Sequence, residues 1–270
     1  MAPITRLAAA ILVFSSVFVS AAPVLAPLAP NTSLNTDGAY GSSPSTESLE
    51  KRASYGQVFA CKTPGTIAIT FDDGPYMFTK DLLDELDKIP GSPKVTFFVN
   101  GSNNGKITDY ASTVKRAYNS GHQIASHTWS HKDMITLSPS ARKSEMTKLD
   151  DAVKKIIGKK PTFMRPPYGS VNDAVLNYLG SAGYTVVNWN IDTEDWNHPL
   201  QVAASMSEYR GAIGKSGAIK KGWIALQHDP NELTAKELGP QAVKYAISQG
   251  FKVVTVGTCL GVSKSKWYRS

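Results

Sequence analysis

Short apolar runs alternate with longer amphipathic segments along most of this chain, and this alternation limits the possible fold more than any other feature. The apolar runs, each predicted to be a strand, span residues 66–71, 94–100, 122–127, 161–167, 184–190, 222–228 and 251–257. The amphipathic segments between them, each predicted to be a helix, span residues 77–90, 107–121, 138–158, 172–183, 198–214 and 235–250. Such alternation is typical of a parallel sheet covered by helices. We therefore expect an α/β fold with about seven parallel strands, either closed as a barrel or open and doubly wound.

The beginning of the chain has the pattern of a secretory signal peptide. Arg6 precedes a short apolar core, residues 7–22, that ends in small residues. A positive charge, a short apolar core and a small-residue end are the features of such a signal. The run is too short and too rich in serine for a membrane span. We expect residues 1–22 to be a signal peptide, the alternative being a buried helix of the fold.

The next segment, residues 23–52, is rich in proline, serine, threonine, glycine and asparagine and poor in large apolar residues. A segment of this composition cannot bury a core. It ends in the dibasic pair Lys51-Arg52, which a kexin-like processing protease would cut. We expect residues 23–52 to be a pro-segment or, alternatively, a flexible linker. Residues 53–270 have the composition and size of a single domain.

The chain has two cysteines, Cys61 and Cys259, which lie near the two ends of this domain. A signal peptide directs a protein to an oxidising compartment, where cysteines pair. We expect a disulfide between them rather than two free thiols.

The formal net charge is +7. A basic surface favours an anionic wall or matrix, or serves only solubility. The lysines are scattered and have no aromatic residues interleaved with them, a pattern that does not favour nucleic-acid binding. The last residues, 264–270, are polar and basic and carry no membrane or lipid anchor signal. We expect a secreted, extracellular or wall-associated monomer with no nucleic-acid partner and no membrane anchor.

Ionisable residues stand at or just after the carboxyl ends of several predicted strands. In parallel α/β folds the ligand site lies beyond these strand ends. The residues placed there are Asp72, Asp73, His127, Arg165, Asp192, Asp195 and His228. Because they come from different strands, we expect them to meet at one edge of the sheet.

His127 and His131 are four residues apart, which puts two imidazoles on one side of a turn or helix. Two histidines and a carboxylate are a common ligand set for catalytic zinc, since a fourth position stays open for water. Taken alone, the pair could equally be two surface histidines. The carboxylates predicted at a neighbouring strand end favour the metal site.

Asp72 and Asp73 are adjacent, and the chain turns after them at Gly74-Pro75. A metal needs a carboxylate ligand, and hydrolysis needs a separate base. At a turn the two side chains can diverge around one pocket, so that one binds metal and the other accepts a proton. The alternative is a pair of aspartates that caps the following helix.

Five motifs in this order resemble the polysaccharide deacetylases of carbohydrate esterase family four, also called the nodulation-factor deacetylase homology domain. The motifs are TFDDGP (70–75), SHTWSH (126–131), RPPYG (165–169), DTEDW (192–196) and IALQH (224–228). The resemblance is closest to fungal secreted chitin deacetylases. It implies a distorted (β/α) barrel and a polysaccharide deacetylase catalytic domain over residues 53–270.

The resemblance also implies roles for the residues of these motifs. Asp72 corresponds to the catalytic base, and Asp73, His127 and His131 to the metal ligands. Arg165 is implied to pair with Asp72, and a neighbouring cation lowers the pKa of a carboxylate. The implied cofactor is one divalent metal ion, zinc, with cobalt as the alternative.

The remaining motif positions correspond to groups that contact the substrate or its leaving group. The resemblance implies that the Tyr168 backbone N–H binds the oxyanion and that His228 is the general acid. Asp195 is implied to orient His228 and raise its pKa. Trp196 and Leu226 correspond to an apolar wall for the acetyl methyl group.

The implied activity is metal-dependent removal of N-acetyl groups from chitin or chitooligosaccharides. An acetylxylan esterase is the alternative within the same fold, followed by a peptidoglycan deacetylase. A wall protein that binds chitin without cleaving it is the alternative from another class. The complete set of catalytic residue types argues against it.

Four further residues have simpler interpretations. Asn100 begins an Asn-Gly-Ser triplet and is predicted to be glycosylated. His122 lies in an apolar strand and is predicted to be a hydrogen-bonded core residue. We expect His198 to be an exposed loop residue and Asp192 to support its loop.

Overall fold

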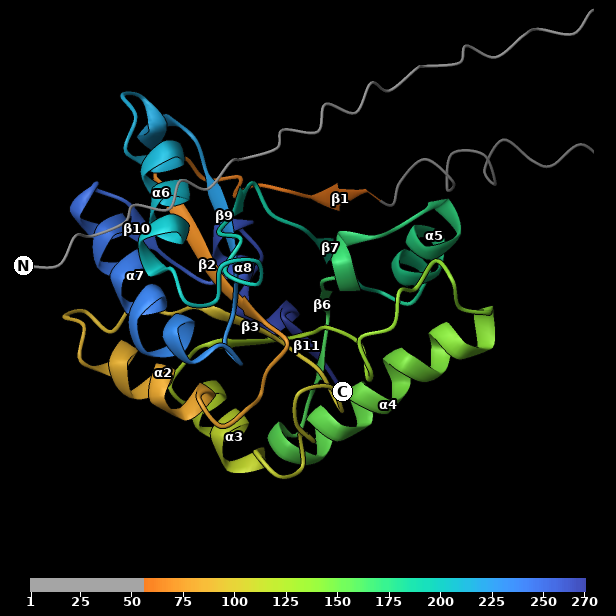
Figure 1. Cartoon of the computed structure of the whole chain (residues 1–270). Helices are drawn as coiled ribbons and strands as arrows, with labels where there is room; N and C mark the ends of the chain where they lie inside the picture. The colour runs from red at the N-terminus through yellow and green to blue at the C-terminus, as the bar shows by residue number, and fades with distance from the viewer. Residues whose placement is uncertain (1–55) are drawn as a thin grey trace, which may run out of the picture. The chain divides into compact units, whose positions relative to one another are not determined.

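The computed structural model describes residues 56–270, which Figure 1 draws in colour. The predicted signal peptide, residues 1–22, and pro-segment, residues 23–52, lie outside the described residues. No helix of the described part is long and apolar enough to cross a membrane.

A nine-stranded sheet forms the centre of the described domain, in the order β1-β7-β6-β4-β3-β2-β9-β8, with β10 also paired to β2. Every pairing within it is parallel. Its strands are β1 (Gln57–Val58), β2 (Thr66–Asp72), β3 (Thr96–Val99), β4 (Gln123–Ser126), β6 (Phe163–Met164), β7 (Thr185–Val187), β8 (Ile191–Asp192), β9 (Trp223–His228) and β10 (Lys252–Val253).

This sheet is a distorted (β/α) barrel, as the sequence predicts. The strand order runs from β1 to β8 without a pairing that joins these two ends. All seven predicted strands are present within the predicted ranges or next to them. The two additional strands, β1 and β8, have two residues each, too few for an alternation pattern to be read.

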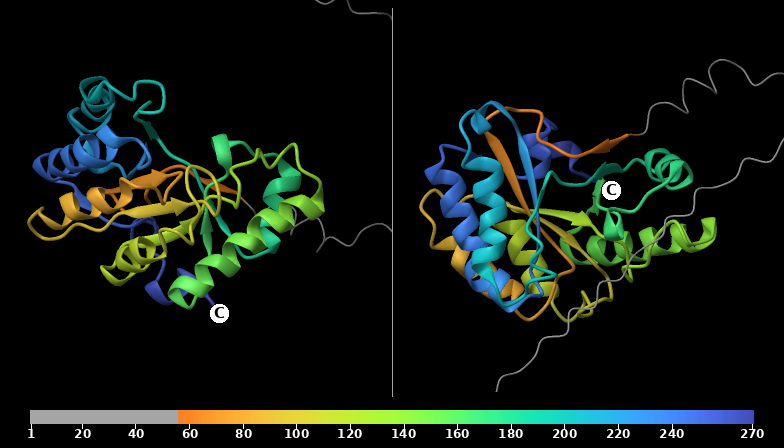
Figure 2. Two further views of the ribbon diagram at one scale, coloured as in Figure 1. Left: turned by 60° about the horizontal axis from the view of Figure 1, so that its bottom comes forward. Right: turned by 45° about the horizontal axis from the view of Figure 1, so that its top comes forward.

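Helices cover the outer side of the strands (Figure 2). They are α2 (Thr79–Asp87), α3 (Ala111–Asn119), α4 (Pro139–Ile157), α5 (Asp173–Ser181), α6 (Val202–Ile213), α7 (Gly239–Ser248) and α8 (Val256–Cys259). Figures 1 and 2 both place α2, α6 and α7 toward one end of the sheet and α4 and α5 toward the other. A π-helical turn, η4 (Thr234–Leu238), precedes α7, and short 3-10 turns lie at η2 (Pro167–Gly169), η3 (Ala218–Lys220) and η5 (Lys264–Lys266).

The core is built on β2, all seven residues of which are buried. Burial on both faces explains why apolar side chains point to both sides of this strand. Phe71 of β2 stacks on Phe97 of β3 with ring centroids 5.6 Å apart. His122 packs its ring edge-on against Phe97, and its Nδ1 accepts a hydrogen bond from the Val95 N–H at 3.1 Å. Burial lowers the pKa of His122 to about 4. The sequence-based interpretation of His122 as a hydrogen-bonded core residue agrees with these contacts.

The end of the chain is part of the fold. Strand β11 (Tyr268–Arg269) pairs antiparallel with β5 (Lys160–Pro161). Trp267 and Tyr268 are buried, and Arg269 donates to the Asp150 carboxylate at 2.8 Å. The sequence indicated only a polar, basic tail, because two buried aromatic residues are too few to mark a strand.

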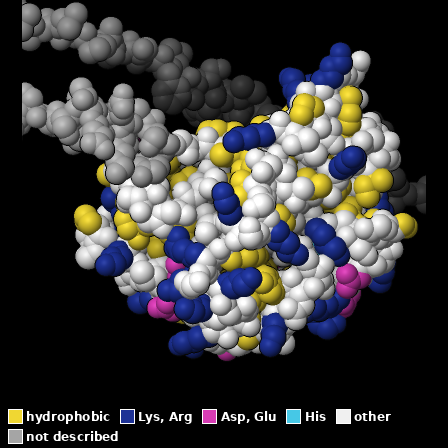
Figure 3. Space-filling view, turned by 180° about the vertical axis from the view of Figure 1, so that it is seen from behind, with side chains coloured by type: hydrophobic (Ala, Val, Ile, Leu, Met, Phe, Trp, Pro, Cys, Tyr) yellow, Lys and Arg dark blue, Asp and Glu magenta, His cyan; other side chains and the backbone are white. Residues whose placement is uncertain are grey.

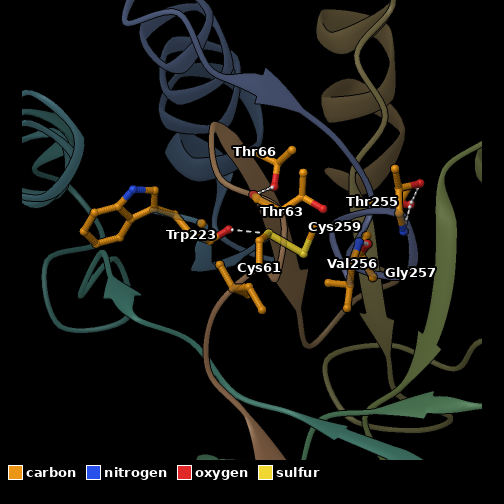
Figure 4. The surroundings of a disulfide bond; sticks show 12 residues. Cys61, Thr63, Thr66, Trp223, Thr255, Val256, Gly257 and Cys259 are labelled. Atoms are coloured by element: carbon orange, nitrogen blue, oxygen red, sulfur yellow. Dashed lines mark hydrogen bonds between the residues drawn. A yellow bond between two sulfur atoms is a disulfide. The ribbon is translucent and has the colours of Figure 1, made fainter. Parts of the chain in front are cut away.

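A disulfide joins Cys61 to Cys259 of α8, residues that are 198 positions apart (Figure 4). The N–H of Lys62, the residue after Cys61, donates to the Cys259 carbonyl at 3.0 Å. Closing so long a loop stabilises a protein by about 5 kcal/mol in the chain-entropy model. The link therefore secures the first strands of the barrel to its last helix.

Basic side chains are spread over the face of the domain that Figure 3 shows. Figure 3 shows Lys and Arg side chains distributed over one face, with few acidic ones among them and no continuous stripe. This distribution agrees with the scattered lysines of the sequence. Basic charge that is scattered in this way serves solubility and attraction to anionic material more than recognition of one polymer.

Candidate active site

A cleft of about 550 Å³ lies beyond the carboxyl ends of the strands. Residues of all five sequence motifs line it: Asp72, Asp73, His127, His131, Tyr168, Asp192, Trp196, Leu226 and His228. Arg165 and Asp195 lie beneath this surface and are almost fully buried. The parallel topology therefore brings together side chains that are more than 150 residues apart in the sequence.

Asp73, His127 and His131 form a group whose ligand atoms lie within 4.8 Å of one another. The Asp73 Oδ1 atom is 3.5 Å from His127 Nε2 and 3.3 Å from His131 Nε2. This oxygen is buried and has no hydrogen-bond partner among the described residues. Burial lowers the pKa of His127 to about 3, which keeps its imidazole neutral. A neutral His127 nitrogen that converges with the His131 nitrogen and a carboxylate oxygen fits a site for a divalent metal ion.

The two adjacent aspartates differ in backbone conformation. Asp72 is the last residue of β2, whereas Asp73 has a φ of 73° and leaves the strand. His131 also has a positive φ, 55°. Non-glycine residues adopt this region only where their surroundings hold them there, and such strain is common at functional sites. The turn at Asp73 directs its carboxylate toward the histidines while Asp72 remains in the sheet.

Contacts behind the metal-ligand group orient the His127 imidazole and hold the backbone next to His131. His127 Nδ1 donates to the Arg165 carbonyl oxygen at 2.8 Å, so that Nε2 carries the free lone pair. The backbone N–H and the hydroxyl of Ser130 each donate to the Glu145 carboxylate at 2.7 Å, next to His131. Glu145 is a buried residue of α4. Sequence reasoning missed it, because a single glutamate on an amphipathic helix carries no signal of such a contact.

Asp72 forms a buried ion pair with Arg165. The guanidinium Nη1 donates to Asp72 Oδ1 at 2.8 Å and to Thr70 Oγ1 at 2.7 Å. Its Nε donates to the Val187 carbonyl at 3.1 Å, and its Nη2 to the Asn188 carbonyl at 3.2 Å. Arg165 is fully buried, so its position is determined by these partners rather than by solvent.

The protonation of Asp72 is governed by two opposing effects. Burial raises the pKa of Asp72 above its usual range, and the charge of Arg165 counteracts part of that rise. The sequence-based expectation, a pKa lowered by the neighbouring cation, is corrected here because it did not include the cost of removing the carboxylate from water. A carboxylate with a raised pKa is a stronger proton acceptor.

His228 is held by Asp195. The His228 Nδ1–H donates to Asp195 Oδ1 at 2.7 Å, and the His228 backbone N–H donates to Asp195 Oδ2 at 2.8 Å. Thr234 donates its hydroxyl to the same carboxylate at 2.7 Å. Burial lowers the pKa of His228, but the hydrogen bond and charge of Asp195 outweigh burial and raise this pKa to about 9. The imidazole is therefore cationic at neutral pH.

Aromatic and apolar side chains form another part of the cleft wall. Tyr168 has a φ of 60°, and its exposed ring packs edge-on against His131 with centroids 4.7 Å apart. Trp196 is 58% exposed, whereas Leu226 is 4% exposed. Trp196 therefore offers an open ring face, and Leu226 contributes an enclosed apolar surface.

Asp192 and His198 lie in and near the loop that carries Asp195. Asp192 accepts a hydrogen bond from Trp189 Nε1 at 3.2 Å and from the Glu194 N–H at 3.0 Å. His198 is half exposed, with its Nε2 3.6 Å from the Glu194 carboxylate. These contacts agree with the interpretation of Asp192 as a support of its loop and of His198 as a loop residue.

Comparison with known proteins identifies the family. The family model described as polysaccharide deacetylase matches residues 60–187. A chitin deacetylase from Pestalotiopsis sp. is 43% identical over 214 residues, which cover 79% of this chain and 70% of the relative. The chain belongs to the polysaccharide deacetylase family. This deacetylase is a hydrolytic enzyme of the class that its motifs predict.

Two further proteins extend the comparison. A probable peptidoglycan-N-acetylglucosamine deacetylase from Arthroderma benhamiae is 44% identical to the deacetylase over 220 residues, 80% of this chain and 49% of the relative. This chain thus spans about half of that protein's length. The solved structure of the chitin deacetylase from Colletotrichum lindemuthianum is 34% identical, with a TM-score of 0.76 over 79% of this chain and 95% of that one.

The predicted glycosylation at Asn100 is not compatible with the folded deacetylase. Asn100 is 1% exposed, and its amide nitrogen donates to the carbonyls of His127 and Thr128. Its amide oxygen accepts from Asn103 at 3.2 Å. A glycan on this nitrogen would replace one of its two N–H donors and has no path to solvent. The triplet matches the sequence pattern, but the pattern does not report burial.

We predict that His228 of the metal-free deacetylase titrates with a pKa of about 9 and that Asp195→Asn lowers this value toward 6.5. The folded pKa lies above the unfolded one. The pairing therefore contributes full stability below about pH 6.5, and this contribution is lost as the pH rises through 9. Histidine NMR shifts followed against pH would measure this pKa. Asp150→Asn, at a remote buried aspartate, serves as the control. A His228 pKa that stays near 9 in Asp195→Asn would contradict the assignment.

Proposed function

We propose that this chain is a secreted, metal-dependent chitin deacetylase that hydrolyses N-acetyl groups of chitin or chitooligosaccharides and releases acetate. The observation that carries the proposal is the separation of two adjacent carboxylates. Asp73 lies against His127 and His131, whereas Asp72 lies against Arg165. Such a site has a metal-ligand group and a separate base side by side. The names of the Pestalotiopsis and Colletotrichum relatives support chitin as the substrate.

Asp73, His127 and His131 would hold one divalent ion, for which zinc is the first choice and cobalt the alternative. The buried Asp73 oxygen without a protein partner supports this assignment. When bound, the ion supplies Lewis-acid polarisation of the acetamide carbonyl. Tyr168 would direct its backbone N–H at the same carbonyl oxygen, where negative charge develops.

Asp72 would act as the general base that takes a proton from the attacking water. The raised pKa of Asp72 suits this role, since a base is most effective when its pKa approaches the working pH. Arg165 holds the carboxylate in place and counters its protonation. Asp72 Oδ2 lies 3.7 Å from His127 Nε2, so base and metal ligands act on the same small volume.

His228 would act as the general acid at the other end of the scissile bond. As the C–N bond of the tetrahedral intermediate breaks, the leaving nitrogen takes the proton from His228 and departs as the amine of the sugar. Asp195 keeps His228 protonated before the reaction. Trp196 and Leu226 would receive the acetyl methyl group, with Trp196 also exposed enough to contact the sugar ring.

The assignment of the two aspartates predicts two different defects. Asp73→Ala should weaken zinc binding by more than about 100-fold because it removes a ligand. Asp72→Asn should bind zinc normally and lower kcat by about 10²–10⁴-fold because it removes the base. Zinc content by elemental analysis and acetate release measure the two effects. The same zinc content and the same residual rate in both variants would contradict the division of roles.

Substrate choice is tested by acetate release from chitin oligomers, peptidoglycan and acetylxylan. We expect the fastest release from chitin oligomers. We also expect His228→Ala to impair amide cleavage more than ester cleavage, since an amine needs protonation to leave and an alkoxide needs it less. Activity on acetylxylan alone would identify an esterase, and preference for peptidoglycan would match the Arthroderma relative's name. If the zinc-loaded protein bound chitin oligomers but released no acetate, deacetylase activity would be excluded.

The beginning of the chain is proposed to be removed in two steps. Residues 1–22 would direct secretion, and residues 23–52 would be cut after Arg52. The proposal rests on the apolar core of residues 7–22, on the scarcity of large apolar residues in residues 23–52 and on the dibasic pair. We expect the secreted protein to begin at Ala53, which N-terminal sequencing measures. A secreted protein that still carries residues 23–52 would show that the segment is a linker.

A further inference from the structure

Asp229 is a buried carboxylic acid that the proposed mechanism does not use. It follows His228 at the end of β9 and is 1% exposed. Its Oδ2 accepts a hydrogen bond from the Thr79 hydroxyl. Its Oδ1 is buried and has no hydrogen-bond partner among the described residues. Burying a carboxyl in this way is costly, so its location calls for a reason.

The Asp229 carboxyl lies directly against Gly74, the residue after Asp73. A Cβ atom added to Gly74 would come within 2.2 Å of Asp229 Oδ2 and 2.5 Å of Oδ1. Such distances are far below van der Waals contact. The carboxyl therefore fills the space under the turn that carries Asp73, and only glycine fits between them.

Thr79 extends this contact to the other side of the turn. Its hydroxyl donates to Asp229 and accepts a hydrogen bond from the Tyr76 N–H at 2.8 Å. The Gly74 carbonyl, in turn, accepts from the Asn100 N–H at 2.7 Å. The segment between Asp73 and α2 is therefore held at Gly74 by Asn100 and at Tyr76 by Thr79, and Asp229 contacts Gly74 and Thr79.

Asp73 needs such support because its own conformation is strained. Its φ of 73° is unfavourable for an aspartate, and its Oδ1 has no hydrogen bond to hold it beside the histidines. We propose that Asp229 is a positioning residue for Asp73, which it holds in the metal-binding conformation through Gly74 and Thr79. This inference rests on the proposed role of Asp73 as a metal ligand.

The simplest alternative is that Asp229 and Thr79 only stabilise the beginning of α2, of which Thr79 is the first residue. A second alternative is that the Asp229 charge attracts the cation without any role for the hydrogen bond. The three explanations differ in their effect on zinc affinity. Contacts that orient a metal ligand typically change the affinity by about 10–100-fold.

Two matched pairs of variants separate these explanations. Thr79→Val removes the hydroxyl at nearly constant volume, and Thr79→Ser retains it. Asp229→Ala removes the carboxyl, and Asp229→Asn retains its shape and one acceptor. The zinc Kd of the folded, metal-free protein is measured by competition with a chromophoric chelator, and circular dichroism verifies folding. We expect Thr79→Val and Asp229→Ala to bind zinc at least about tenfold more weakly than wild type. Thr79→Ser and Asp229→Asn should stay within about threefold of wild type, well below that range.

A remote buried aspartate provides the control for stability alone. Asp150 is 4% exposed and accepts from Arg269 at 2.8 Å. Asp150→Ala should lower the melting temperature and leave the zinc Kd unchanged. Equal zinc Kd values in wild type, Thr79→Val and Asp229→Ala would overturn the inference. So would equal losses in Asp229→Asn and Asp229→Ala with a normal Thr79→Val, which would point to charge. If either Thr79→Val or Asp229→Ala does not fold, the other pair decides. Wild-type protein that bound no zinc would overturn the metal site itself.

Discussion

The buried guanidinium of Arg165 is the interaction on which the catalytic centre depends. Arg165 follows the last residue of β6, and its guanidinium donates to Thr70 and Asp72 of β2 and to the Asn188 carbonyl. The backbone carbonyl of Arg165 accepts a hydrogen bond from His127 Nδ1. A fully buried cation is tolerated only where its donors are satisfied. The need to satisfy them therefore sets the distance between Asp72, the proposed base, and His127, a proposed metal ligand.

A second constraint separates carboxylates that crowd the same small cleft. Asp72 forms an ion pair with Arg165, and Asp195 forms one with His228. Asp73 turns out of the strand toward the histidines. Each carboxylate thus has a different partner. One cleft can then contain the proposed base Asp72, the proposed acid His228 with a pKa of about 9, and a candidate metal-ligand group. The asymmetry comes from the partners and not from the aspartates themselves.

Much of this arrangement could be predicted because it depends on short sequence patterns. The apolar runs and amphipathic segments predicted a parallel α/β sheet, and the five motifs predicted the family and, through it, the barrel. Contacts between distant segments carry no such pattern. Glu145 reaches Ser130 from a helix, and Asp229 lies under Gly74, yet neither has a sequence signal. Asn100 has the glycosylation pattern but is buried, and burial is a property of the whole fold.

From the residue types and their order alone follow the α/β alternation, the disulfide partners and the set of groups that gather at the strand ends. These depend on short-range periodicity and on the topology of parallel sheets, both of which the sequence pattern indicates. The direction of the Asp72 pKa shift, the fate of Asn100 and the support beneath Asp73 depended on the folded chain. Each is set by desolvation or by packing between segments far apart in sequence. Both effects arise only when the barrel has formed.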